Sequence, residues 1–414
     1  MGRILVVGGR GFIGRHVAVA LKEAGQRVEA PSHEDFDIAR EEAADLAQKL
    51  AGVEVVVNCA GLARDARLDN IEAVNLEGPK RLAEACKQAG VRRLVHLSTL
   101  GAGAADPTRL QRAKGEAETA LSAVGDLEVT IVRPSLIMGQ GGAIGDFFSA
   151  LAALPICPRL GPGTWTVQPL HVSELALLVA KLTTAGANAG TVDAVGPSPM
   201  TTDAVETTLR RWLGLSDPWF ASFPRAFLAL LAWANEIVEV GPGDRQLLTL
   251  LERGNVGDPA AATAALGRPP RALEESLALT PATTADLWRA ALYFVRPMLR
   301  IALALLWIGT GLVSFGLFPP SEFYVILAQA GIRGPVAEFA LFGGAAVNLA
   351  LGAMMLVNWR VAKVALAMLA LLIVYSLAAL LLPSEYWLNP FAPILKNIPI
   401  GVALLALMAM ENKR

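Results

Sequence analysis

The chain has 414 residues, with 36 Lys and Arg against 37 Asp and Glu, so its formal net charge is −1. This balance gives no sign of a polyanion binder, and nucleic acid is not an expected partner. The 54% hydrophobic content and the mean hydropathy of +0.46 are too high for a wholly soluble enzyme and too low for a chain made only of membrane spans.

Charged residues separate two parts of the chain. Residues 297–414 contain only 11 of the Lys, Arg, Asp and Glu residues, which predicts a membrane part after a soluble part. We expect domains over residues 1–196, 197–285 and 286–414. The three cysteines form no CxxC motif and the four histidines are scattered, so neither a disulfide framework nor a metal site is expected.

The first elements are a strand and a helix joined by glycines. The apolar run at residues 3–8 is too short for the core of a secretory signal and predicts a buried parallel strand. A helix ending at Gly25 follows the glycine turn. Strand patterns recur at 28–30, 53–58, 93–98 and 129–132, and helix patterns at 43–50, 76–89 and 108–124. This alternation predicts an α/β fold, a doubly wound parallel sheet of the Rossmann type.

Residues 197–285 are richer in Pro, Gly, Asp and Thr and predict a small cap over the carboxyl ends of the strands. Within them the apolar run at 223–238 carries Arg225 and Glu236. Its length favours a core helix, with an interfacial helix lying on lipid as the alternative.

Four long apolar stretches follow, at about 299–317, 339–357, 361–382 and 394–410, and predict a four-helix transmembrane bundle. Cations that flank these stretches predict their orientation. Arg333 and Lys396 fall on one side, and the other side has Arg289, Arg296, Arg300, Arg360, Lys363, Lys413 and Arg414. The positive-inside rule then places the Rossmann domain and the C-terminus in the cytoplasm, with the spans in the cell inner membrane.

The glycine turn, Gly8-Gly9-Arg10-Gly11-Phe12-Ile13-Gly14, contains a G-x-G-x-x-G motif between a strand and a helix. Gly8 permits the tight turn, Gly11 lets a pyrophosphate approach the backbone, and Gly14 allows the helix to pack closely on the strand. The helix amides then face the phosphates. We therefore predict a nicotinamide dinucleotide site that includes Phe12 and Ile13.

The cofactor preference depends on the end of the second strand. A carboxylate there, about 20 residues after the loop, would accept from the ribose 2′-hydroxyl of NAD, but Ser32 and His33 hold that place. Arg10 can meet a 2′-phosphate, so NADP(H) is favoured over NAD(H), although Arg10 can also be a solvated loop charge. Asp37 and Ile38 are expected near the adenine, with capping of the next helix as the alternative for Asp37.

Several later motifs, taken with the glycine loop, resemble the extended and atypical short-chain dehydrogenase/reductases over about residues 1–280. They are Asn58-Cys59-Ala60-Gly61, Asn75, Ser98-Thr99, Lys114 and Arg133-Pro134-Ser135. Within that superfamily the chain looks most like the branch with the Rossmann-type accessory subunit of respiratory complex I, partly through Val167-Gln168-Pro169-Leu170-His171-Val172.

This resemblance implies site residues. Active members use a Tyr four residues before the Lys to transfer a proton, and a Ser on the preceding strand to orient the substrate. Lys114 and Ser98 match two of these positions and are the catalytic candidates, but Leu110 holds the Tyr position. All four tyrosines lie at residue 293 or later, which removes the usual mechanism of carbonyl reduction. The cofactor contacts implied by the resemblance are Cys59, Ala60, Gly61, Ser98, Lys114 and Pro134.

Simpler structural interpretations are open for several of these residues. Lys114 can hydrogen-bond the nicotinamide ribose or be a surface lysine, and Ser98 can cap backbone groups. His96 and the lone His171 are interpreted as structural, and Cys59 as a small apolar residue without a redox role.

Residues from about 299 to 414 resemble the DoxX-like membrane domain through segments 307–311, 348–352 and 393–399. Asn348 and Lys396 are polar positions in this region, with interhelical hydrogen bonding and snorkelling as the simpler explanations.

The preferred functional hypothesis is a membrane-anchored, NADP(H)-binding atypical reductase that acts on, or senses redox state for, a lipid-soluble partner such as a quinone. The rival is a non-catalytic nucleotide-binding module that stabilises or assembles a membrane protein complex. A third possibility, isomerisation or dehydration of a nucleotide sugar, is disfavoured by the missing Tyr.

Overall fold

A computed structural model describes residues 2–65, 69–106, 108–184, 190–238, 241–382 and 395–411. It contains two compact units. The first comprises Met1–Trp233 and Gly241–Ala290, and the second comprises Ala234–Val240 and Ala291–Arg414. The first unit thus contains the segment predicted as the Rossmann domain and, apart from residues 234–240, the segment predicted as its cap.

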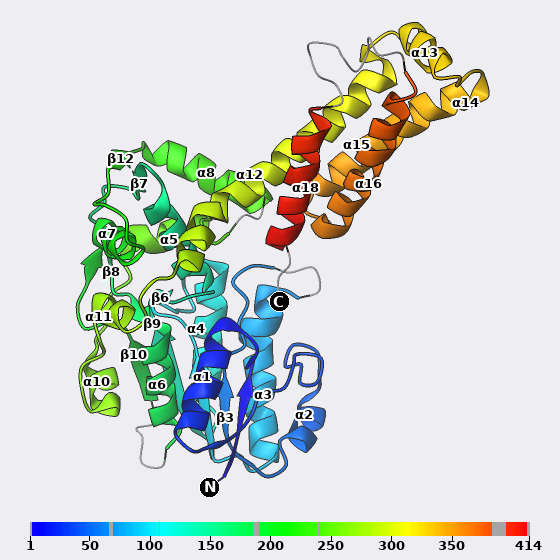
Figure 1. Ribbon diagram of the computed structural model, residues 1–414. Coiled ribbons are helices and arrows are strands. Elements are labelled where there is room, and N and C mark those ends of the chain that lie inside the picture. The colour runs from blue at the N-terminus through cyan, green and yellow to red at the C-terminus, as the bar shows by residue number, and fades with distance from the viewer. Residues whose placement is uncertain are drawn as a thin grey trace. The chain divides into compact units, whose positions relative to one another are not determined.

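A six-stranded parallel sheet forms the centre of the first unit (Figure 1). Its strand order is β10-β5-β4-β3-β1-β2. The strands are β1 (Arg3–Val7), β2 (Arg27–Glu29), β3 (Val53–Asn58), β4 (Arg93–Leu97), β5 (Glu128–Pro134) and β10 (Gly190–Ala194). The chain runs outward from β1 to β2 and then crosses to β3 on the other side, so the topological switch point lies between β1 and β3, where ligands bind in such sheets. The predicted fold class is confirmed.

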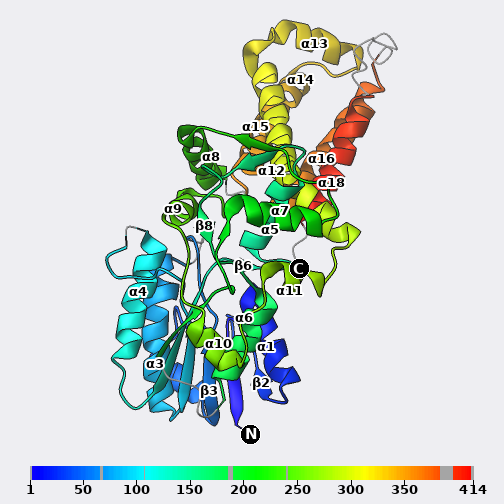
Figure 2. The same cartoon turned by 90° about the vertical axis from the view of Figure 1, so that its left-hand side faces the viewer.

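Helices cover both faces of this sheet (Figure 2). One face carries α1 (Phe12–Glu23), α6 (Val172–Leu182) and α10 (Ala260–Leu266), and the other carries α2 (Ala43–Lys49), α3 (Gly78–Gln88) and α4 (Arg109–Ser122). Consecutive residues of β1 alternate between the two cores: Ile4 and Val6 belong to one, Leu5 and Val7 to the other. A strand buried on both faces therefore reads as an uninterrupted apolar run.

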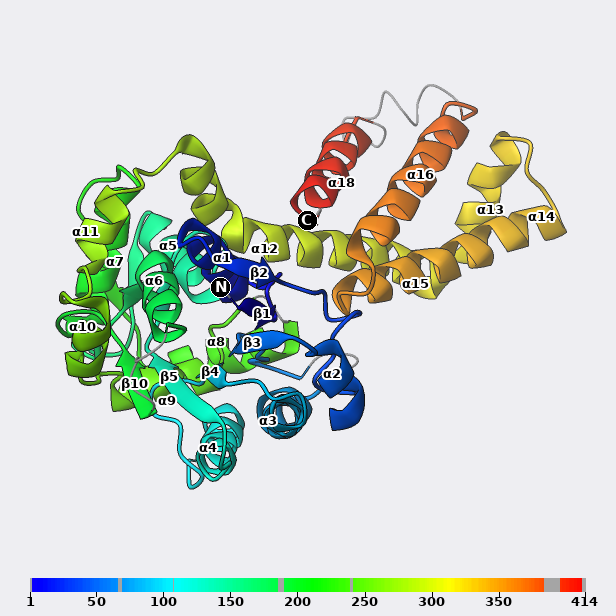
Figure 3. The same cartoon turned by 90° about the horizontal axis from the view of Figure 1, so that it is seen from below.

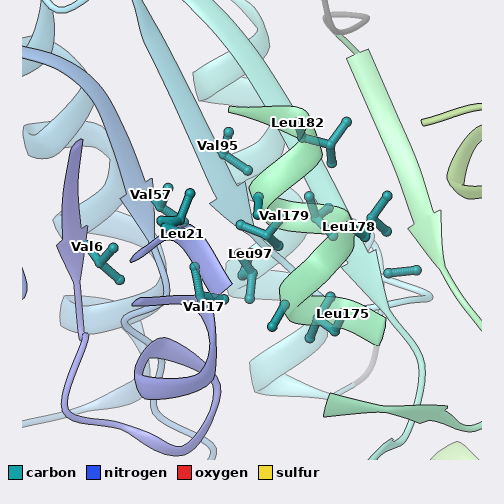
Figure 4. Close-up of a cluster of buried hydrophobic side chains, with 14 of the residues drawn as sticks. Val6, Val17, Leu21, Val57, Val95, Leu97, Leu175, Leu178, Val179 and Leu182 are labelled. Carbon is teal, nitrogen blue, oxygen red and sulfur yellow. The ribbon is translucent and has the colours of Figure 1, made fainter. Parts of the chain in front are cut away.

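The core between the sheet, α1 and α6 is built from helical and strand apolar residues (Figure 4). Val17 and Leu21 of α1 and Leu175, Leu178 and Val179 of α6 are all fully buried. Their spacing of three and four residues places them on one helical face, which packs on the strands through Val6, Val57 and Val95. This packing fixes the start of α1 next to the end of β1.

Three two-stranded pairs and further helices complete the first unit. The pairs are β6 (Ile137–Met138) with β9 (Leu170–His171), β8 (Thr166–Val167) with β11 (Met200–Thr201), and β7 (Cys157–Arg159) with β12 (Phe220–Ser222). The helices are α5 (Ala143–Ala153), α7 (Thr202–Trp212), α9 (Arg245–Arg253), α11 (Leu273–Ala278) and the part of α8 (Arg225–Val238) up to Trp233. A π-helical turn, η1 (Ala73–Glu77), precedes α3.

The second unit is helical. Its elements are the later part of α12 (Thr284–Leu312), then η2 (Val313–Leu317), α13 (Pro320–Gln329), α14 (Pro335–Glu338), η3 (Phe339–Gly343), α15 (Gly344–Leu356), α16 (Val361–Ala379) and α18 (Asn397–Glu411). α16 packs on both α15 and α18 (Figure 3). At Gly352 an added Cβ would lie 2.6 Å from Ile308 Cγ1, so this glycine permits the close approach of α15 to α12.

Among the described residues, three helical segments are long and apolar enough to cross a membrane: Thr284–Leu317, Pro335–Leu356 and Val361–Ala379. The expected fourth stretch, 394–410, corresponds to α18, which has 15 residues. Its residue 394, and the flanking Lys413 and Arg414, lie outside the described residues. The expectation of four spans stays a prediction.

Candidate cofactor site

The glycine loop is a backbone cradle in which Gly8 and Gly14 have no room for a side chain. Gly8 has φ +69°, and its Cβ would lie 2.8 Å from Ala60 N. At Gly14 a Cβ would lie 2.2 Å from Gly8 O. Gly11 donates its amide to Gly8 O at 3.0 Å and forms the N-cap of α1, without a capping side chain among the described residues. The first amides of α1 are thus left for an anion.

A carboxylate that sequence analysis missed lies at the predicted ribose position. Ser32 is buried, and its hydroxyl donates to Asp35 Oδ2 at 2.5 Å and accepts from Asp35 N at 3.3 Å. The Ser32 hydroxyl lowers the pKa of Asp35, to which Arg10 and Lys49 also contribute. His33 is exposed. The preference for NADP(H) therefore cannot rest on a missing carboxylate at the end of the second strand, because Asp35 supplies one three residues after Ser32. The Ser-x-x-Asp spacing of a side-chain turn was the available signal.

Asp37 and Ile38 are held by local structure. Asp37 Oδ1 accepts from Ala39 N at 2.8 Å, and its other oxygen pairs with Arg40 at 2.9 Å. The N-cap of α2 is Glu42, so the alternative that Asp37 caps this helix is wrong. Ile38 is buried and its Cγ1 would lie 3.0 Å from a Cβ on Gly78. A role of both residues near the adenine stays a prediction.

At the end of β3 a buried amide organises the next turn. Asn58 Oδ1 accepts from Ala60 N at 3.1 Å, and its amide nitrogen lies 3.1 Å from His96 Nδ1 in β4. Burial, reinforced by the charge of Lys114, lowers the pKa of His96 to about 3, so this histidine is neutral and structural. Cys59 is half-buried, and burial raises the pKa of its thiol to about 12. It holds no thiolate at neutral pH.

Two buried polar groups meet at the carboxyl end of β4. Lys114 of α4 is only 8% exposed and donates from Nζ to Leu97 O at 3.0 Å, so its interpretation as a surface lysine is wrong. Burial lowers the pKa of Lys114 to about 8. Ser98, the next residue after Leu97, is 4% exposed, and its hydroxyl has no hydrogen-bond partner within the described part of the chain. A buried hydroxyl of this kind can bond a ligand or a water.

The neighbouring loop after β3 approaches Lys114. A Cβ on Gly61 would lie 3.6 Å from Lys114 Nζ and 3.4 Å from Asn75 Oδ1. Pro134 ends β5 at the same edge, where its carbonyl accepts from Leu100 N at 2.9 Å. The structure therefore brings Cys59, Ala60 and Gly61 to the same edge of the sheet as Ser98, Lys114 and Pro134.

Leu110, at the position of the family tyrosine, serves packing. It is partly buried against a cluster of Ile71, Leu76, Ala113 and Ala117, which joins η1 to α4. A leucine here offers neither a proton nor a hydrogen bond. The site therefore contains the lysine and serine of the family pattern without its acid.

Cap residues are tied to the loops at this edge by contacts that sequence analysis did not find. Arg64, just after the β3 loop, donates to Asp244 Oδ2 at 2.9 Å, and Asp244 in turn caps α9. Arg253 at the end of α9 pairs with Asp106 at 2.8 Å. These ion pairs hold residues 241–253 against the loops that follow β3 and β4. No sequence pattern indicates pairs that lie so far apart in the chain.

His171 has a local role. It is the N-cap of α6, where its Nδ1 accepts from Ser173 N at 3.3 Å. It also lines a cavity of about 30 Å³ beside Asp146 and Arg289, which holds one or two waters at most. The cavity is too small for an organic substrate.

Two family models match the sequence. The NAD dependent epimerase/dehydratase family matches residues 4–192, and the DoxX-like family matches residues 304–406. The chain joins an NAD dependent epimerase/dehydratase domain to a DoxX-like domain. The DoxX-like domain and the three long apolar helices indicate a membrane protein. The fold and family resemblances predicted from the sequence are confirmed.

Curated relatives share the first domain. NADH dehydrogenase (ubiquinone) 1 alpha subcomplex subunit 9, mitochondrial, of Arabidopsis thaliana is 30% identical over 234 residues, covering 50% of this chain and 58% of its own length. The ceramide reductase of Caulobacter vibrioides is 31% identical over 192 residues, covering 42% and 59%. This chain thus spans less than two thirds of the length of either relative.

Solved structures show the fold of the first unit. A UDP-glucuronic acid 4-epimerase from Bacillus cereus, in complex with UDP-glucuronic acid and NAD, matches with a TM-score of 0.51 at 18% identity. The match covers 70% of this chain and 98% of the epimerase. At 18% identity this likeness shows the fold of the first unit and no more.

Proposed function

We propose that this protein is a membrane-anchored, NAD(P)(H)-binding oxidoreductase of the atypical short-chain type that acts on a lipid-soluble substrate. One observation carries the proposal: the Ser98 hydroxyl is buried without a partner among the described residues, beside the buried ammonium of Lys114 and across the sheet edge from an open glycine loop. A buried hydroxyl without a hydrogen-bond partner costs stability, so a ligand that accepts a hydrogen bond from this hydroxyl gains affinity.

Each end of the site would hold one part of the cofactor. The backbone of Gly8, Gly11 and Gly14 and the first amides of α1 would hold the pyrophosphate, with Phe12 and Ile13 beside it. Arg10, Ser32, His33, Asp37 and Ile38 would face the adenosine half. Cys59, Ala60, Gly61, Lys114 and Pro134 would face the nicotinamide half. The bound dinucleotide supplies or accepts a hydride.

Lys114 would hydrogen-bond the nicotinamide ribose, and Ser98 would orient the reacting group of the substrate. Leu110 cannot give a proton, so water or another side chain has to supply it. A quinone, whose reduced oxygens can be protonated from water, tolerates this loss of the tyrosine better than a simple ketone. The name of the ceramide reductase relative also agrees with a lipid substrate for a domain of this kind.

We propose NADP(H) as the preferred cofactor, through Arg10 and a 2′-phosphate. Asp35 opposes this preference, since its carboxylate is close enough for Arg10 to lower its pKa. Arg10→Ala and Asp35→Asn separate the two effects. Arg10→Ala is expected to weaken NADPH binding more than NADH binding, and Asp35→Asn to do the opposite.

The proposed placement is the cell inner membrane, with four spans and with the first unit and the C-terminus in the cytoplasm. The cations Arg296, Arg300, Arg360 and Lys363 would then lie on the cytoplasmic side. Accessibility of single cysteines to an impermeant reagent in whole cells tests this arrangement.

A second candidate is a non-catalytic dinucleotide-binding module for a membrane complex. It is favoured by Leu110 at the tyrosine position and by the relatives that are named as subunits of an NADH dehydrogenase. Bound cofactor would then act on folding alone, adding about 2.7 kcal/mol of stability at a concentration 100-fold above its dissociation constant.

The test uses the full chain purified in detergent and loaded with NADPH. Nicotinamide fluorescence is followed after addition of quinone analogues and of a long-chain keto lipid. A steady decay in the wild type, absent from Gly11→Asp, supports the oxidoreductase, because a carboxylate at Gly11 repels the pyrophosphate.

The matched control is Gly125→Asp, at an exposed glycine where an added Cβ would meet open space. It is expected to keep the wild-type decay. Cofactor that binds tightly and stays reduced with every acceptor would overturn the enzymatic proposal and favour the second candidate.

A further inference from the structure

Helix α8 exposes an apolar face that the first unit does not cover. Phe227, Leu230, Leu231 and Trp233 are 41–55% exposed, and Phe223, just before the helix, is 37% exposed. Residues 227, 230 and 231 share one face of the helix, and the Phe223 ring lies against the Phe227 ring. The prediction that favoured a core helix for 223–238 is therefore wrong for this face. Single exposed apolar side chains are ordinary, but a continuous row marks an interaction surface.

The rest of α8 is anchored to the protein. Leu228 and Ala232, four residues apart, are buried and hold the opposite side of the helix. Arg225 donates to both oxygens of Glu252 in α9, at 2.6 and 3.0 Å. The only cation in this part of the helix is thus paired at its edge, and the exposed face between residues 227 and 233 has no charge.

The aromatic content of the surface suits a membrane interface. The rings of Phe223 and Phe227 lie with centroids 5.3 Å apart, and Trp219 and Trp233 are also exposed. Trp and Phe combined with Leu on one helical face are typical of helices that lie in the boundary between headgroups and acyl chains.

The same helix continues into the membrane unit. Residues 225–233 of α8 belong to the first unit, whereas Ala234–Val240 belong to the unit that carries the apolar spans. The chain itself therefore joins this helix to the unit whose apolar helices are long enough to cross a bilayer. This continuity selects lipid over other occupants of the apolar face.

We propose that α8 is an interfacial helix, whose face formed by Phe223, Phe227, Leu230, Leu231 and Trp233 is inserted in the bilayer surface. The ion pair Arg225–Glu252 stays on the water side. This inference goes beyond the proposed function, because it holds whether the first unit is an enzyme or a binding module. It gives the first unit a second attachment to the membrane besides α12.

The experiment places a nitroxide on the full-length protein in nanodiscs of phosphatidylcholine and phosphatidylglycerol. Single cysteines replace Phe227 or Leu231, and Glu116→Cys on the exposed side of α4 is the control. The native cysteines are poor competitors for the label, since burial raises the pKa of all three thiols. Collisions with oxygen, which partitions into lipid, are compared with collisions with a water-soluble nickel chelate.

The expected result is an oxygen-to-nickel accessibility ratio several-fold higher at 227 and 231 than at 116. Equal ratios at the three positions would overturn the proposal. Labels at 227 and 231 shielded from both reagents, in a manner that depends on protein concentration, would also overturn it and indicate a protein occupant such as a second copy.

A second variant checks that the face itself causes the insertion. Leu230→Glu with Leu231→Glu leaves the melting temperature in detergent nearly unchanged, because both side chains are exposed. In nanodiscs it is expected to lower the ratio at 227 to that of the control position. An unchanged ratio would show that the spans alone hold position 227 in lipid, against the proposal. Neither readout requires cofactor or turnover, so failure here is separate from failure of the proposed function.

Discussion

The two ends of the candidate cofactor site differ in what forms them: backbone at one end and side chains at the other. At the glycine loop the geometry comes from the backbone, where added Cβ atoms would lie within 3.0 Å of other atoms at Gly8 and Gly14. At the other end it comes from buried side chains, Ser98 and Lys114, which have few partners among the described residues. The features proposed to bind a dinucleotide are therefore separable from those proposed to carry out chemistry. Leu110 alters the second end while the first stays intact.

The largest effect is expected at the backbone end. In Gly14→Ala the new Cβ would lie 2.2 Å from Gly8 O and 2.8 Å from Gly9 Cα, so the loop has to move. We expect a loss of about 3 kcal/mol in stability and loss of cofactor binding. Thermal unfolding of the purified protein with and without NADPH measures both.

Gly125→Ala is the control for this change, because its Cβ meets open space. It should melt and bind like the wild type. If Gly14→Ala behaved in the same way as this control, the loop would not be a rigid cradle.

At the side-chain end, the next effect depends on pH. Burial puts the pKa of Lys114 at about 8, below its ordinary value of 10.5. Between these two values the unfolded chain carries a proton that the folded chain lacks, so stability rises with pH across the window. The cost of the buried charge is fully present below pH 8 and amounts to about 3 kcal/mol at most.

Lys114→Met removes this dependence. The wild type should gain melting temperature relative to the variant when pH rises from 7.5 to 9.5, while Lys87→Met, on the exposed side of α3, should track the wild type. A constant difference between wild type and Lys114→Met over that range would contradict the lowered pKa.

Much of the backbone end could be predicted from the sequence, because glycine spacing between a strand and a helix is a local pattern. The strands, including the one with His96, follow from short apolar runs and the helices from the 3.6-residue period, whereas Lys114 was singled out by the family resemblance. These features need no knowledge of distant contacts.

What could not be predicted depends on how the chain folds back on itself. Asp35 was missed because it comes three residues after Ser32, the position where a ribose carboxylate was sought. Hydrogen bonds between Asp35 and the Ser32 hydroxyl bring the carboxylate back to that position. The Arg64–Asp244 pair joins residues 180 positions apart. The exposed face of α8 was misjudged because a 3.6-residue apolar period indicates a helix without telling which side is covered, and only the packing of Leu228 and Ala232 decides it.

Leu110→Ala sharpens the contrast between packing and chemistry at the tyrosine position. The truncation removes contacts with the cluster formed by Ile71, Leu76, Ala113 and Ala117. Because Leu110 is only partly buried, a loss of about 1–2 kcal/mol is expected, below the range for a fully buried leucine. Denaturant unfolding measures the loss.

Cofactor affinity and any turnover should not change in this variant. Leu279→Ala, at a side chain that is 63% exposed, is the control and should alter stability by less than about 0.5 kcal/mol. A fall in turnover without a fall in stability would mean that Leu110 shapes the reacting site, contrary to the packing role.

The smallest effect on stability is expected at Ser98. Its hydroxyl has no partner among the described residues, so Ser98→Ala should not lower stability and should raise it by up to about 1 kcal/mol. Ser135→Ala is the matched change at another buried serine, whose hydroxyl bonds Asn255 Oδ1 at 2.5 Å, and should cost about 1–3 kcal/mol. If the Ser98 hydroxyl binds a ligand, Ser98→Ala should weaken cofactor binding or turnover about tenfold, because a lost hydrogen bond of about 1.4 kcal/mol changes an equilibrium constant tenfold. Ser135→Ala should change neither cofactor binding nor turnover. Equal losses of stability in both variants would show that the Ser98 hydroxyl is used within the fold, and the site would then lack the group on which its chemistry depends.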